Sequence, residues 1–176
     1  DVYKRQAFVD VLHGIYEHSP WIPERAAKLA PFGNITALKQ AMQGVVFAAT
    51  RAEQLQLIRA HPELAGKAAI AGTLTAESTG EQAKAGLNLC SPEEFATLQQ
   101  LNSDYNSKFG FPFILAVKGA TGKGLTRQQI IATFTRRLRN QPEDELREAL
   151  RQIGRIAEMR INDLLGHVPA IGATVM

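Results

Sequence analysis

Hydrophobic residues recur every three or four positions through the first third of the chain, which is the spacing of an α-helix. This pattern predicts helices over residues 6–18, 35–49 and 51–60. Ser19-Pro20 is expected to open a shorter helix through residues 21–30, because Pro20 and Pro23 would lie in its first turn, where prolines are tolerated. Pro62 should end the run, because the residue before a proline is pushed out of the α region.

Two capping boxes mark helix starts in the second half of the chain. The box at Ser91–Glu94 predicts a helix that Gly110 ends, and the box at Thr126–Gln129 predicts a helix running to about residue 139. The apolar run 111–117 fits either a buried extended segment or a short core helix, since its periodicity does not distinguish them. A last long helix is predicted over 142–165.

The composition is that of a soluble globular protein, with 176 residues of which 45% are hydrophobic and 21% charged. With the helical pattern, it predicts an all-α fold, a single domain over residues 1–176 built as a bundle of about seven to nine helices. Cys90 is the only cysteine, so no internal disulfide can form, which fits a reducing compartment. We expect a cytoplasmic protein, because we find no membrane-length apolar run, signal-peptide pattern or peroxisomal tripeptide. The net charge of +3 favours a small anionic substrate and gives no reason to expect nucleic acid.

Arg160 stands out in the helix predicted over 142–165. On a helical wheel it lies about 20° from Ile153, at the edge of an apolar stripe about 40° wide. That stripe consists of Leu146, Ile153, Ala157 and Leu164. A guanidinium facing the core is costly unless an anion meets it. The anion could be a ligand, or it could be a structural partner such as Glu81 or Asp163.

His61 is the most informative of the four histidines, because it lies at a predicted helix end directly before Pro62. A helix C-terminus stabilises a charged imidazolium, which could donate a proton near neutral pH. The alternative is a residue that only caps the helix. The other three histidines have no metal-ligand spacing, so no metal site is expected.

The segment 78–82 also has two interpretations. Ser78 and Glu81 form a local capping box, which explains them without any ligand. Alternatively, Ser78, Glu81 and Gln82 share one turn at a helix start, where backbone N–H groups can gather around an anion.

Four segments, in this order, are similar to those of the 2-oxo-4-hydroxy-4-carboxy-5-ureidoimidazoline (OHCU) decarboxylases: HPELAGKAA, LTAESTGEQAKAGL, LNSDYNSKFGFPFILAVKG and IAEMRINDLL. SPWIPERAA near the start also resembles that family, and the similarity extends from about residue 8 to residue 166. The resemblance implies an all-helical homodimer that acts in urate breakdown without a cofactor.

The resemblance also implies roles for individual residues. The family's catalytic residues correspond to His61, Glu81 and Arg160. Met159 replaces the leucine that usually precedes that arginine. The residues implied to bind the substrate or line its site are Pro62, Ser78, Gln82, Phe111, Phe113, Ile114 and Leu115.

The expected reaction is the stereospecific decarboxylation of OHCU to (S)-allantoin. The substrate carries an imine next to the carbon that loses carbon dioxide, so it supplies its own electron sink. Two alternatives stay open from the residues alone. The chain could be a non-catalytic helical interaction module, or a lyase or hydrolase acting on a related ureido compound.

Overall fold

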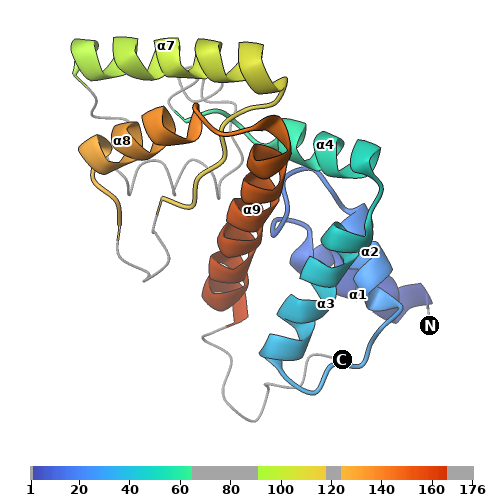
Figure 1. Cartoon of the computed structure of the whole chain (residues 1–176). Helices are drawn as coiled ribbons and strands as arrows, with labels where there is room; N and C mark the ends of the chain where they lie inside the picture. Colours follow the sequence, from blue (N-terminus) through green and yellow to red (C-terminus); the bar gives the residue numbers. More distant parts are fainter. Residues whose placement is uncertain (1, 65–90, 118–123, 166–176) are drawn as a thin grey trace. The chain divides into compact units, whose positions relative to one another are not determined.

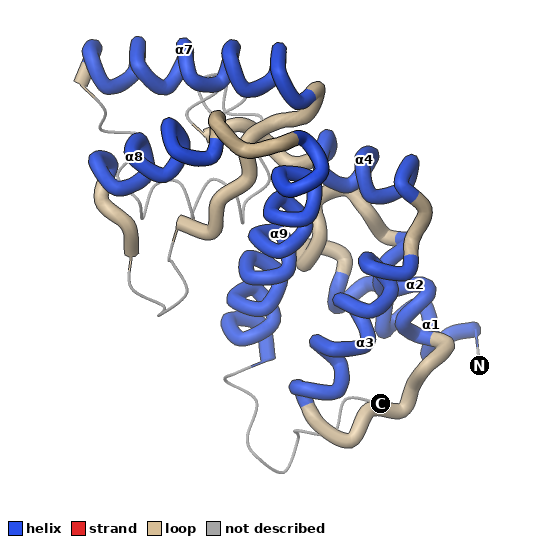
Figure 2. The backbone as a smooth tube through the Cα atoms, viewed as in Figure 1, coloured by secondary structure: helices blue, strands red, loops and turns tan. Residues whose placement is uncertain are grey.

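The computed structural model describes residues 2–64, 91–117 and 124–165. Within these ranges the regular structure consists of seven helices joined by loops, without a β-strand (Figure 2). The predicted all-α fold is therefore confirmed, and seven helices, the lower end of the predicted range, already lie within the described residues.

The chain divides into two compact units. The N-terminal unit contains residues 1–60 and 154–176, and the middle unit contains residues 61–153. The division between the two units falls within the last helix, α9 (Pro142–Leu165), after residue 153. The single domain over 1–176 stays a prediction.

The N-terminal unit packs short helices around an apolar core. Its helices are α1 (Val2–Leu12), α2 (Trp21–Ala27), α3 (Ile35–Ala48), α4 (Arg51–Ala60) and the second part of α9. Helix α2 packs against both α1 and α3. The core side chains, which include Leu12, Ile22, Leu38, Met42 and Leu57, are buried. The side chain of Asn34 caps α3 by accepting the N–H of Ala37 at 2.8 Å.

The first predicted helix is wrong at its end. Helix α1 stops at Leu12, six residues before the predicted boundary at residue 18. The Ile15 N–H bonds the Leu12 carbonyl at 3.1 Å in a tight turn, and His18 has a positive φ of 47°, which no α-helix contains. This turn lets Glu17 lie buried.

The middle unit is organised around α7 (Pro92–Phe109). Both capping boxes are present, at the start of α7 and at the start of α8 (Arg127–Arg137). Gly110 ends α7 with a φ of 75°, as predicted from its lack of a Cβ. Helices α7 and α8 pack against each other (Figure 1).

Aromatic rings fill the space between α7 and α8. Tyr105 on α7 lies edge-on to Phe113 and Phe134, with ring centroids 5.4 and 5.7 Å away. Phe113 and Phe134 stack with centroids 3.8 Å apart. The segment 111–117 that brings Phe113 here is neither helix nor strand, so the alternative of a short core helix is wrong.

Candidate active site

His61 follows the last residue of α4, as the sequence predicts, and its side chain is only 5% exposed. Pro62 comes next and prevents the helix from continuing. A histidine in this position has a fixed backbone and limited access to water. Such a group can deliver a proton to one face of a bound molecule.

The backbone after His61 is held by two asparagines of α7. The Asn102 side-chain N–H donates to the Leu64 carbonyl at 3.0 Å. One turn further, the Asn106 side chain donates to the Glu63 carboxylate and, at 2.9 Å, to the Asn102 carbonyl. The loop 61–64 is therefore tied to one face of α7.

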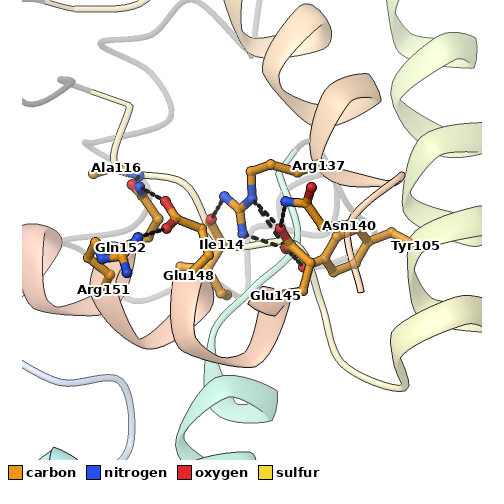
Figure 3. A network of polar contacts seen from close by, with 9 residues as sticks. All are labelled: Tyr105, Ile114, Ala116, Arg137, Asn140, Glu145, Glu148, Arg151 and Gln152. Carbon is orange, nitrogen blue, oxygen red and sulfur yellow. Dashed lines mark hydrogen bonds and ion pairs between the residues drawn. The ribbon is translucent and has the colours of Figure 1, made fainter. Parts of the chain in front are cut away.

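The segment 111–117 forms an apolar wall that is tied by polar side chains from two other helices. Phe111, Phe113, Ile114 and Leu115 are all buried, and their role in lining the site stays a prediction. Arg137 of α8 donates to the Ile114 carbonyl at 2.6 Å, and Gln152 of α9 accepts the Ala116 N–H at 3.0 Å (Figure 3). A buried segment outside any helix or strand needs such partners for its backbone N–H and C=O groups.

Arg137 also forms a buried ion pair with Glu145, at 2.9 Å between Nη2 and Oε2 (Figure 3). Asn140 donates to the same carboxylate at 2.9 Å, and the Tyr105 hydroxyl donates to it as well. Burial acts to raise the pKa of Glu145, but the hydrogen bond and charge of Arg137 outweigh it and hold this pKa below its usual range. Burial, assisted by Glu145, raises the pKa of Tyr105, so its hydroxyl stays protonated and donates.

Sequence reasoning missed Arg137, although the signal was present. Ile130, Phe134 and Arg137 follow at helical spacing, and all three are buried in α8. The wheel that singled out Arg160 would have found Arg137 in the same way. Its guanidinium also lies 4.4 Å from the centre of the Phe113 ring, a favourable cation–π position.

Arg160 faces the interior of the N-terminal unit, as predicted, and is 6% exposed. Its Nη2 donates to Glu17 Oε1 at 2.8 Å, and its Nη1 lies 3.3 and 3.4 Å from the carbonyls of Gly14 and Ile15. Glu17 lies 143 positions before Arg160, so the local sequence pattern gives no sign of this partner. The predicted apolar stripe is wrong at Leu164, which is 44% exposed near the end of α9.

The remaining predicted site residues, Ser78, Glu81 and Gln82, lie outside the described residues. His61 and the apolar wall belong to the middle unit, whereas Arg160 belongs to the N-terminal unit. The meeting of His61, Glu81 and Arg160 in one cavity therefore stays a prediction. No group of three or more metal-ligating side chains occurs among residues 2–64, 91–117 and 124–165. In the same part of the chain, no helix has the length and apolarity to cross a bilayer.

The sequence model of the OHCU decarboxylase family matches residues 2–162. The chain belongs to this family. It is 41% identical to the 2-oxo-4-hydroxy-4-carboxy-5-ureidoimidazoline decarboxylase of Haloferax volcanii, over 88% of the chain and 87% of that protein. The chain is also 42% identical to the uric acid degradation bifunctional protein of Bacillus subtilis. This alignment covers 91% of the chain and 31% of the longer protein.

A solved structure supports the same assignment at the level of the fold. A crystal structure of (S)-allantoin synthase superposes with a TM-score of 0.70 at 29% identity. The match covers 91% of this chain and 50% of that one. The OHCU decarboxylase fold is thus present as a part of longer proteins as well as on its own.

Proposed function

We propose that this chain decarboxylates OHCU to (S)-allantoin without a cofactor, in the breakdown of urate. The observation that carries the proposal is its membership of the OHCU decarboxylase family across residues 2–162. The buried position of His61, directly before Pro62, supports the proposal.

The chemistry needs few groups from the protein. The bond between the ring carbon and its carboxylate breaks, and its electron pair forms a double bond to the neighbouring carbon while the imine nitrogen takes a proton. The hydroxyl of the resulting enol then loses its proton, and the neighbouring carbon gains one. The face that receives this last proton sets the configuration of the product.

In this mechanism His61 donates the proton to one face of the ring, a role typically worth about 10²–10⁴-fold in rate. Glu81 and Arg160 hold the ring and its ureido arm by charge-assisted hydrogen bonds. Ser78 and Gln82 bind beside Glu81. The wall formed by Phe111, Phe113, Ile114 and Leu115 excludes water, which favours the loss of charge as carbon dioxide leaves.

The experiment generates OHCU in situ from urate with the upstream enzymes and follows circular dichroism as allantoin accumulates. The wild-type protein should give a rapid optical signal. His61→Ala should leave only slow, racemic product from spontaneous decay. The matched control is His13→Ala, because His13 is exposed and its ring forms a hydrogen bond with the Asp10 carbonyl, three residues earlier in the chain. An optical signal in His61→Ala equal to that of the control refutes the assignment.

The same assay separates the alternatives. A non-catalytic interaction module would leave the decay racemic in every variant, and an enzyme for a related ureido compound would be inactive on OHCU. We also propose a homodimer and a cytoplasmic location, both from the family resemblance and the sequence pattern. Light scattering coupled to gel filtration should give twice the mass of the 19.3 kDa chain.

A further inference from the structure

The two polar atoms of the Asn102 side-chain amide differ in their hydrogen bonding. The side chain is 3% exposed, and its nitrogen donates to the Leu64 carbonyl at 3.0 Å. Its oxygen, Oδ1, is buried and accepts no hydrogen bond. Among the described residues it is the one buried side-chain oxygen or nitrogen in this condition.

A buried acceptor without a donor is unfavourable, because it has lost its water and gained nothing in return. Proteins pair nearly all such atoms, and the exceptions are often sites where a ligand or water completes the bond. A leucine would fill similar space without this penalty, although it would lose the bond to Leu64. The oxygen therefore points to a missing hydrogen-bond donor.

The position of the amide is well defined. Its nitrogen is tied to Leu64, three residues after His61, and Asn106 braces Glu63 in the same loop. Because the amide is planar, fixing the nitrogen also fixes the direction of Oδ1. The unpaired oxygen thus lies next to the loop that carries the proposed proton donor.

We propose that Asn102 Oδ1 accepts a hydrogen bond from an N–H of the ureido arm of the substrate. This inference rests on the proposed function. The ureido arm is rich in N–H donors, whereas a carboxylate has none. A neutral amide oxygen accepts an N–H without adding a negative charge that would repel the carboxylate of the substrate.

The test compares two ligands that differ only in the arm. Allantoin carries the ring and the ureido group, and hydantoin carries the ring alone. Calorimetry gives the ratio of their affinities for the wild-type protein and for Asn102→Leu. Loss of one hydrogen bond to the arm should lower this ratio roughly five- to tenfold. A purely structural role would weaken both ligands alike and leave the ratio unchanged.

Asn106→Leu is the matched control, because it removes a brace of the same loop from the same face of α7 but leaves Oδ1 in place. Its affinity ratio should equal that of the wild type. If Asn102→Leu does not fold, Asn102→Ala takes its place in the comparison. An unchanged ratio in the Asn102 variant overturns this inference alone, provided that the wild type turns over OHCU. A wild type without turnover overturns the proposed function, and this inference with it.

Discussion

Replacing Glu145 by glutamine tests whether the buried ion pair with Arg137 holds the middle unit together. The carboxylate is fully buried and accepts hydrogen bonds from Arg137, Asn140 and Tyr105. Glutamine has nearly the same shape but no charge, so the buried guanidinium, 2% exposed, loses its counter-ion. Breaking a buried pair from one side typically costs about 3–5 kcal/mol.

We expect a loss near the lower end, about 3 kcal/mol, because glutamine keeps one oxygen as an acceptor. With a urea dependence of about 2 kcal/mol per molar, the unfolding midpoint should fall by about 1.5 M. The measurement is urea unfolding followed by far-ultraviolet circular dichroism.

The matched control is Glu148→Gln, one turn further along α9. Glu148 pairs with Arg151, whose side chain is 58% exposed, so its loss should cost less than about 1 kcal/mol. Equal midpoints for Glu145→Gln and Glu148→Gln would refute the reasoning.

The same pair predicts how stability depends on pH. The pKa of Glu145 is lower in the folded protein than in the unfolded chain, mainly because Arg137 outweighs the effect of burial. The unfolded state therefore binds the proton first, and the stabilisation is complete above about pH 5 and lost as the pH falls below about 4. The unfolding midpoint of Glu145→Gln should vary less with pH in this range than that of the wild type.

Two further predictions concern the N-terminal unit and the end of α7. Arg160→Lys keeps the charge but loses the planar guanidinium that donates to Glu17, so it should lower both the turnover of OHCU and the melting temperature. Normal values for both would mean that the buried guanidinium has no role. Gly110→Ala should lower the free energy of unfolding, measured in urea, by about 1 kcal/mol, because a φ of 75° strains any residue with a Cβ. An unchanged unfolding midpoint would contradict this account of how α7 ends.

Helix starts and ends that depend on neighbouring residues were predictable. The capping boxes at Ser91 and Thr126, the stop at Gly110 and the bounds of α9 all agree with the sequence pattern. Each of these features rests on contacts within about four residues. The inward orientation of Arg160 was predictable for the same reason, because a helix places every third or fourth side chain on one side.

The turn after Leu12 and the irregular course of 111–117 were harder to predict from the sequence. Apolar spacing continues beyond Leu12 at Ile15, so periodicity alone extends the helix too far. The segment 111–117 is apolar at every position, and such a run has no period to interpret. Its conformation depends on Arg137 and Gln152, which come from other helices.

By itself, the sequence determined which segments are helical, where the caps lie and that Arg160 turns inward, since all of these follow from short-range geometry. Only the tertiary structure decided which partners those groups meet. Glu17 reaches Arg160 across 143 positions of the chain, and Asn102 reaches Leu64 across 38. No local pattern specifies such pairs, because packing brings distant segments together and leaves one oxygen of Asn102 without a donor.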